Sequence, residues 1–262
     1  DNLGTVNRNL GAIDKAINYY SEAINMSKVN DLLEMDTILP SLMINLASSY
    51  IWIAKSDQAL ELLVKLNDNN VDPLIIAQKK LYLGFVYTQK RMFSASLKTF
   101  SEAEELYKEN EIFDPNAIAN IKSAIGAIYA EKNVFEEAEK YLLEAIDICL
   151  LHYGDSAASL PIFYNNLGFL FHRQKKYESA IETFQKALNL VRKTSPFNFF
   201  EEAKYIYNIA SVNFSKKNYL NAKILFEAAK KTWTNHYEDN HQYMILLDEK
   251  LKESIEMLGF QT

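Results

Sequence analysis

The sequence has few of the residues that interrupt helices or cross-link small folds. Its 262 residues include 7 Gly, 5 Pro and one Cys. A sheet-rich chain needs a turn about every 8 to 12 residues, and turns draw on Gly and Pro, so their scarcity favours helices. The single thiol, Cys149, cannot form an internal disulfide. Its isolation excludes the disulfide-linked secreted class and any metal site built from several thiolates.

Excess positive charge and long apolar runs are also missing. Lys and Arg number 28 against 34 Asp and Glu, which gives a net charge of −6 at pH 7. The overall field repels a polyanion, so we expect no direct nucleic acid partner. No apolar run approaches the roughly 20 residues that span a bilayer, and the first residues lack the basic and apolar pattern of a leader. We therefore expect a cytoplasmic chain without a membrane partner.

Catalytic and metal-binding motifs are absent from the sequence as well. The four His, at positions 152, 172, 236 and 241, include no pair at the spacing of a zinc-binding helix. Glycine-rich nucleotide loops and the Gly-x-Ser-x-Gly turn of hydrolases do not occur. Cys149 follows the apolar residues Ile146 and Ile148, where a thiol is usually inert packing. The sequence predicts no enzyme, no cofactor and no metal.

The chain is instead rich in internal repetition. A pair consisting of an apolar and then a small residue recurs six times, and successive small residues lie 43, 37, 42, 42 and 42 residues apart. An aromatic residue or Asn follows each small residue by three positions, Ala or Ser by twelve, an aromatic or Leu by sixteen, and Ala or Leu by nineteen. The six small residues are Gly4, Ala47, Gly84, Gly126, Gly168 and Ala210.

This pattern is typical of a helical hairpin. A small residue in the first helix lets the second helix approach closely, and the Ala of the second helix lies where the two backbones nearly touch. The order of residues resembles the tetratricopeptide repeat, and Asn165-Asn166-Leu167 is similar to a motif of its long, 42-residue variant in kinesin light chains and bacterial signalling proteins. The resemblance implies an all-α, right-handed solenoid of about six hairpins. It is weakest around Ala47, where Leu66 replaces the last Ala.

The two ends of the repeat array differ. Gly4 already occupies the middle of a first helix, so we expect the array over residues 1–240 to be truncated at its N-terminus. Residues 241–258 form one amphipathic helix without a hairpin partner, and Gly259 provides a stop. We expect residues 241–262 to be a capping helix and tail, because a solenoid needs a polar element over its exposed end.

The resemblance implies that the first helices line a concave wall that binds ligand. Four positions on each first helix, spaced i, i+4, i+7 and i+11, form the outward stripe of that wall. These positions carry mostly amides, hydroxyls and aromatics. The predicted peptide-binding residues are Asn45, Tyr82, Phe85, Asn120, Asn166, Phe169, Arg173, Lys204 and Asn208.

Each predicted residue type has a distinct role. An amide offers a donor and an acceptor at once, so the resemblance implies that Asn45, Asn166 and Asn208 hold the main chain of an extended peptide. Aromatic residues make side-chain pockets, and Arg173 and Lys204 select charge. Alternatively, the Asn residues are solvated surface and the aromatics belong to the core. Two basic residues are too few to favour a clamp on a terminal carboxylate.

The sequence therefore predicts a non-enzymatic module that binds a protein or an extended peptide. An alternative is the peptide-sensing half of a bacterial transcription regulator, with a helix-turn-helix preceding residue 1. Another is the scaffold of a larger protease or ATPase effector, with its chemistry outside this chain. Self-association of two copies through the edge repeats is also open.

Overall fold

A computed structural model describes residues 13–29, 35–68, 71–196, 198–234 and 242–259. Its described residues form twelve α-helices and no strand, which confirms the predicted all-α class. Among the described residues, no helix is both long and apolar enough to cross a membrane. The helices are α2 (Ile13–Val29), α3 (Met35–Trp52), α4 (Ser56–Lys65), α5 (Pro73–Gln89), α6 (Phe93–Glu109), α7 (Pro115–Glu131), α8 (Phe135–Tyr153), α9 (Leu160–Arg173), α10 (Tyr177–Thr194), α11 (Phe199–Ser215), α12 (Tyr219–Thr234) and α13 (Gln242–Gly259).

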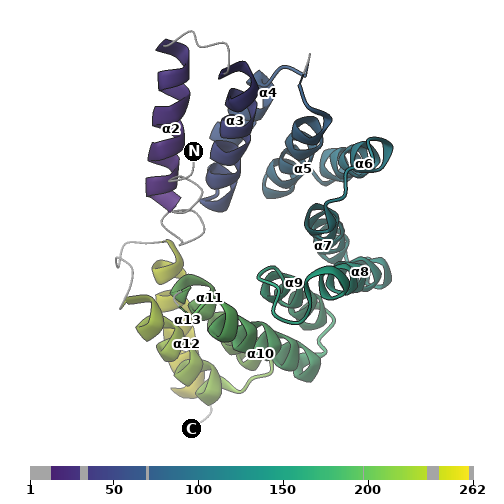
Figure 1. Ribbon diagram of the computed structural model, residues 1–262. Helices are drawn as coiled ribbons and strands as arrows, with labels where there is room; N and C mark the ends of the chain where they lie inside the picture. Colours follow the sequence, from purple (N-terminus) through teal and green to yellow (C-terminus); the bar gives the residue numbers. More distant parts are fainter. Residues whose placement is uncertain (1–12, 30–34, 69–70, 197, 235–241, 260–262) are drawn as a thin grey trace. The chain divides into compact units, whose positions relative to one another are not determined.

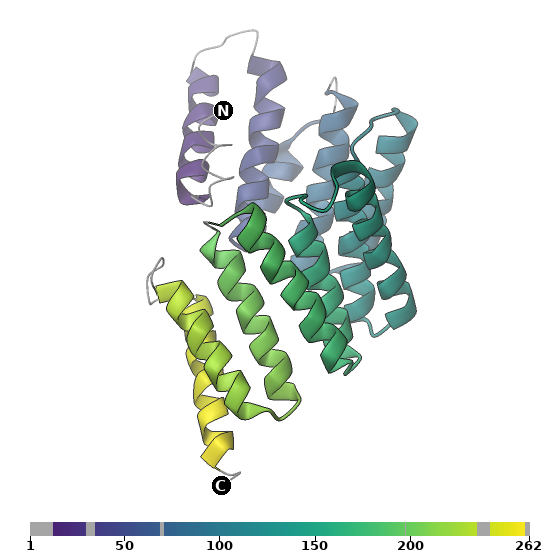
Figure 2. The same ribbon diagram turned by 60° about the horizontal axis from the view of Figure 1, so that its bottom comes forward.

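The chain divides into two compact units, residues 1–128 and 129–262. In the first unit, α2 packs on α3, and the hairpins α3–α4 and α5–α6 pack side by side. In the second unit, α8 packs on α9, and the hairpins α9–α10 and α11–α12 follow. Helix α13 then covers α12, as the yellow helix in Figures 1 and 2 shows. Both units have the paired helices of a tetratricopeptide-like solenoid.

The predicted repeat register is confirmed by the packing inside the hairpins. A Cβ atom added to Gly84 would lie 2.4 Å from the ring of Phe100, and one added to Gly168 would lie 2.8 Å from the ring of Phe184. Each ring belongs to the residue sixteen positions after the small one. The close approach of the two helices thus requires glycine in the first helix, because the second helix fills the space with an aromatic side chain.

The turns after the first helices share one backbone conformation that the sequence does not reveal. The seventh residue after the small one has a positive φ of 57° to 64° in every such turn that the structure describes. The N–H of the next residue donates to the carbonyl five residues earlier, at 2.8 to 2.9 Å. This hydrogen bond gives a partner to one of the carbonyl groups at the C-terminal end of the helix. None of the five residues is glycine, the usual choice for this conformation: Ala54, Arg91, Asn133, Lys175 and Lys217.

Lys217→Gly is therefore expected to stabilise the second unit. A non-glycine residue in the left-handed region costs roughly 1–2 kcal/mol, and the greater freedom of glycine in the unfolded chain offsets part of the gain. We expect a net gain of about 0.5–1 kcal/mol, seen as a rise of about 2–4 °C in Tm by circular dichroism. Lys217→Ala is the matched control, because it removes the same side chain and keeps the strain. An equal rise in both variants would contradict the account.

The hairpin around Ala47 differs from the others, as the weaker repeat there indicates. Helix α4 has only 10 residues, and Leu66 follows it as a buried residue in extended conformation. The side chain of Lys79 on α5 is almost fully buried and donates to the carbonyl of Leu66 and to Asp68 Oδ1, both at 2.7 Å. Lys79 thereby holds the chain where a longer second helix would otherwise continue.

Candidate functional site

The predicted site residues fall into both units. Asn166, Phe169 and Arg173 lie on α9, and Lys204 and Asn208 lie on α11, all in the second unit. The others lie in the first unit: Asn45 on α3, Tyr82 and Phe85 on α5, and Asn120 on α7. Gly4, His236 and His241 lie outside the described residues.

One pocket in the second unit brings together three of the predicted residues. It has a volume of about 220 Å³ and lies between α9, α11, α12 and α13. Phe169, Lys204 and Asn208 line it, as the sequence predicts for a shared surface. Its other described lining residues are Asn165, Ala203, Tyr207, Trp233 and Leu247. We call these eight residues the α9–α11 pocket.

A chain of amide hydrogen bonds begins at the α9–α11 pocket and ends at Asn166, which is not one of its lining residues. Asn208 Nδ2 on α11 donates to Asn165 Oδ1 on α9 at 2.6 Å. Asn165 Nδ2 in turn lies 3.5 Å from Asn166 Oδ1. The first bond fixes the amide of Asn208 toward the neighbouring repeat, so that Asn208 and Asn165 present one continuous polar edge.

A buried carboxylate lies beside the same pocket. Glu201, in the first turn of α11, is 4% exposed and accepts hydrogen bonds from Lys204 Nζ at 2.6 Å and from the Tyr205 hydroxyl. Burial raises the pKa of Tyr205 above its usual range, and the negative charge of Glu201 adds to the effect. Lys204 Nζ also lies 5.1 Å from the centre of the Tyr205 ring. The charge of Lys204 is therefore largely compensated before any ligand arrives.

Arg173 is also engaged in an ion pair that the sequence analysis did not predict. Its guanidinium donates to Glu131 Oε1 at 3.3 Å and to Asn133 Oδ1 at 3.0 Å. These partners belong to the turn that ends α7, so Arg173 links α9 to the preceding repeat. This pairing reduces its capacity to select the charge of a ligand.

The predicted residues of the first unit have packing contacts of their own. The centre of the Phe85 ring lies 5.3 Å from the centre of the Phe100 ring, in an edge-to-face arrangement. It lies 6.3 Å from the centre of the Tyr82 ring. Asn120 Nδ2 donates to the carbonyl of Asn116 at 2.8 Å, within its own helix. Asn45 is partly buried on α3. Through its contact with the buried Phe100, the Phe85 ring packs against the core of the hairpin.

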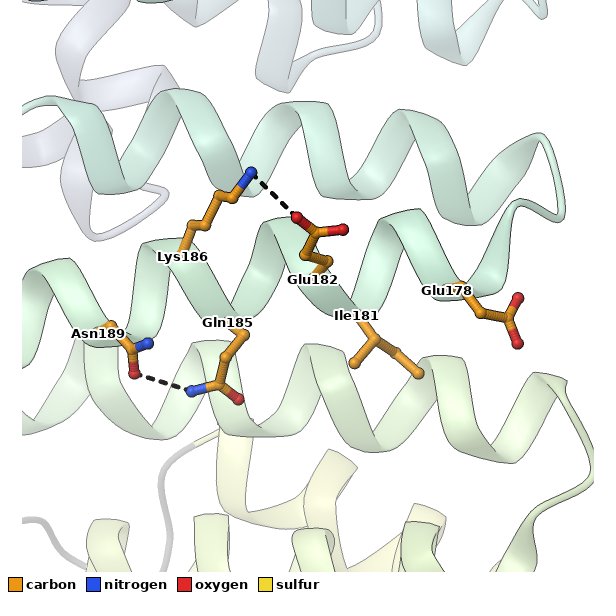
Figure 3. A pocket seen from close by; sticks show the side chains of 6 residues that line it. All are labelled: Glu178, Ile181, Glu182, Gln185, Lys186 and Asn189. Carbon is orange, nitrogen blue, oxygen red and sulfur yellow. Dashed lines mark hydrogen bonds and ion pairs between the residues drawn. The ribbon is translucent and has the colours of Figure 1, made fainter.

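A second, shallower depression lies on the exposed surface of α10 (Figure 3). Its described lining residues all come from this one helix. Two interactions within the helix occupy four of its polar groups: Lys186 with Glu182 at 3.2 Å, and Gln185 Nε2 donating to Asn189 Oδ1 at 2.9 Å. Glu178 pairs instead with Lys216, in the turn between α11 and α12. Neighbouring helices add none of the described side chains, so this surface serves better as a control than as a site.

His172 and Cys149 each lie beside a serine hydroxyl. The described part of the chain contains no group of three or more His, Cys, Asp or Glu side chains that could hold a metal ion. His172 Nε2 lies 2.8 Å from Ser215 Oγ, and burial lowers the pKa of its ring. Cys149 is buried, with its Sγ 3.3 Å from Ser159 Oγ.

Five pocket residues were not predicted from the sequence: Asn165, Ala203, Tyr207, Trp233 and Leu247. Asn165 and Tyr207 lie 42 residues apart, at the position three residues before the small residue of their repeats. That position is one turn before the residue that follows the small one, so it shares the outward face. Both residues immediately precede a position of the predicted outward stripe, Asn166 and Asn208, so a stripe widened by that one position would have included them. Trp233 and Leu247 come from other helices, which one repeat's periodicity cannot place.

The fold and repeat register define a helical-hairpin repeat protein. Residues 117–193 match a family model described as tetratricopeptide repeat, and residues 1–30 match a second model of the same description. Tetratricopeptide repeats are thus matched over these two segments of the chain, and the paired helices described above have the fold of that repeat.

One known protein is similar to part of the chain in sequence. BBSome complex member BBS4 from Xenopus tropicalis is 32% identical over 103 residues, which are 38% of this chain and 18% of that protein. The chain thus spans less than a fifth of that relative's length.

Solved structures show the same fold at low sequence identity. A Rap protein complexed with competence and sporulation factor matches with a TM-score of 0.68 and 16% identity, over 98% of this chain and 75% of the other. BtubC from P. vanneervenii matches with a TM-score of 0.61 and 20% identity, over 88% of this chain and 95% of the other.

Proposed function

We propose that the chain is a non-enzymatic interaction module whose second unit binds an extended peptide segment along α9 and α11. The observation that carries this proposal is the α9–α11 pocket, in which a polar amide edge adjoins exposed and half-buried aromatic side chains. Amides suit the alternating donors and acceptors of a peptide main chain, and the aromatics suit its side chains.

The electrostatics of the pocket favour a neutral peptide. Glu201 compensates Lys204, and Glu131 compensates Arg173, so neither cation is available at full strength for an acidic ligand. Asn166 and Asn208 hold the main chain in this proposal, and Phe169 contacts a side chain. Asn45, Tyr82, Phe85 and Asn120 would form a similar surface of their own in the first unit. A Rap protein of matching fold was solved in complex with competence and sporulation factor, and this complex supports a binding role for the fold.

Double substitution of Asn166 and Asn208 by Ala is expected to weaken peptide binding. Each lost hydrogen bond costs about 0.5–1.5 kcal/mol, so we expect Kd to rise about 10-fold or more. The probe is a fluorescent peptide selected from a random displayed library on the unmodified protein, and the readout is fluorescence polarisation.

The matched control is the double substitution Gln185→Ala and Asn189→Ala on α10. It also removes two amides, but from a surface that shares no lining residue with the α9–α11 pocket. We expect this control to bind with unchanged Kd, and both variants to keep the helical circular dichroism of the unmodified chain. Equal affinity of the Asn166/Asn208 variant, or an equal loss in the control, would place binding elsewhere.

A further inference from the structure

The base of the α9–α11 pocket is built from three different helices. Ala203 on α11, Trp233 on α12 and Leu247 on α13 are each at most 2% exposed. Phe169 and Tyr207 stand above them with larger exposed fractions, together with the amide edge. The C-terminal helix thus contributes directly to a surface otherwise made by the first helices of two repeats.

We propose that this pocket receives one aromatic side chain of the bound peptide and that α13 completes it. This inference rests on the proposed function and specifies the residue type that the peptide must carry. It also assigns to α13 a part in ligand binding in addition to covering the end of the array.

The size of the pocket limits its occupant. Its volume of about 220 Å³ is below the roughly 300–1,000 Å³ of pockets that hold whole small-molecule ligands or cofactors. One large side chain is a suitable occupant, with the rest of the peptide outside. The amides at the rim are then placed to bond to the main chain on either side of that residue.

The chemistry of the walls favours an aromatic occupant over a charged one. Phe169 and Tyr207 offer accessible ring surface above the buried ring of Trp233, and ring surfaces attract another ring in offset or edge-to-face contact. A carboxylate gains little from Lys204, whose ammonium already pairs with Glu201 at 2.6 Å. A cationic side chain gains as little, because the Glu201 carboxylate is buried and already pairs with Lys204. An aliphatic side chain fits but lacks the ring contacts.

Helix α13 is held in place by contacts that continue into the pocket. Met244 packs in a buried cluster with Ala203 and Trp233. Leu247 belongs to a larger core cluster that includes Phe226 and Ala229 of α12. The base of the pocket, to which Leu247 contributes, is complete only when α13 is docked. Binding therefore shifts the population toward the docked helix and slows its opening.

The two tryptophans of the chain allow a direct test of the pocket. Trp52 lies on α3 in the other unit and is 51% exposed, whereas Trp233 is 1% exposed. Trp52→Phe leaves Trp233 as the only fluorescent indole, inside the pocket. The probes are the N-acetyl amides of phenylalanine, leucine, lysine and glutamate, titrated while Trp233 emission is recorded. We expect a saturable change with the phenylalanine amide at a Kd of about 1 mM. The leucine amide should bind about fivefold more weakly, and the charged amides should have no effect.

Three further variants, made in the Trp52→Phe background, separate pocket loss from unfolding. Phe169→Ala removes an exposed ring at the rim, and Leu247→Ala removes the contribution of α13 to the base. Each substitution is expected to raise the Kd for the phenylalanine amide about fivefold or more. Ile245→Ala changes a 56% exposed residue on the same helix and should bind like the parent. Hydrogen exchange across residues 244–258 should slow when the phenylalanine amide is bound. The inference would be overturned by any of three results: no change in Trp233 fluorescence, an equal fluorescence change with all four amides, or an unchanged hydrogen-exchange rate in α13.

The outcome also distinguishes this inference from the proposed function. Tight binding of a library-selected peptide with a silent Trp233 would overturn the aromatic pocket and leave peptide binding intact. The opposite result is binding of the phenylalanine amide together with an unchanged peptide Kd in the Asn166 and Asn208 double variant. It would support the aromatic pocket and contradict the extended main-chain site.

Discussion

Gly168→Leu is expected to destabilise the second unit by about 3 kcal/mol, with a fall of about 10 °C in Tm. The physical reason is steric. Even a Cβ atom at this position would lie 2.8 Å from the Phe184 ring, and leucine adds three further carbons. Phe184 is fully buried among residues of α10 and α11, so its ring has no space to move into. Thermal unfolding followed by circular dichroism measures the effect.

The matched control for this prediction is Gly259→Leu. Gly259 is the last residue of α13, and an added Cβ atom there meets nothing within 4 Å. We expect its Tm to stay within about 2 °C of the unmodified protein. A normal Tm for Gly168→Leu would mean that the helices of this hairpin do not approach as closely as the repeat register requires.

The second large effect is expected from Glu201→Ala, at about 3 kcal/mol of lost stability. Glu201 accepts from both Lys204 and the Tyr205 hydroxyl, and Tyr205 has no exposed surface. Without the carboxylate, the hydroxyl is buried and loses this acceptor. Lys204 suffers less, because 24% of its side chain is exposed and can reach water. Chemical denaturation with urea measures the loss.

A double variant distinguishes the buried hydroxyl from simple loss of packing. Glu201→Leu combined with Tyr205→Phe removes the carboxylate and the hydroxyl together and keeps most of the side-chain volume. We expect this double variant to recover at least half of the stability that Glu201→Ala loses. If it is as unstable as Glu201→Ala, the hydrogen bond between Glu201 and Tyr205 is not the cause.

The sequence was sufficient to predict the hairpins and their register. The reason is physical: a small residue and an aromatic sixteen positions later must face each other whenever two helices pair closely, and Gly84 with Phe100 and Gly168 with Phe184 do so. The same spacing placed Phe169, Lys204 and Asn208 on one surface, where they line one pocket.

Other features depend on contacts that periodicity does not encode. The pairing of Arg173 with Glu131 joins residues 42 positions apart and depends on the rotation of one helix against another. The left-handed turn residues could not be predicted, because positions such as Lys175 and Lys217 are not glycine, the residue that usually indicates this conformation. Trp233 and Leu247 enter the pocket from α12 and α13. Sequence reasoning that treats each repeat alone cannot bring these helices together.

Site-specific photo-crosslinking tests the central claim, that a peptide binds along α9 and α11, most directly. A photoreactive p-benzoylphenylalanine is placed either at Ser211, one helical turn after Asn208 on α11, or at Gln185 on the exposed surface of α10. Each protein is irradiated with a labelled, library-selected peptide. The account predicts a crosslinked product at position 211 that excess unlabelled peptide suppresses, and none at position 185. Crosslinking at position 185 alone would contradict it.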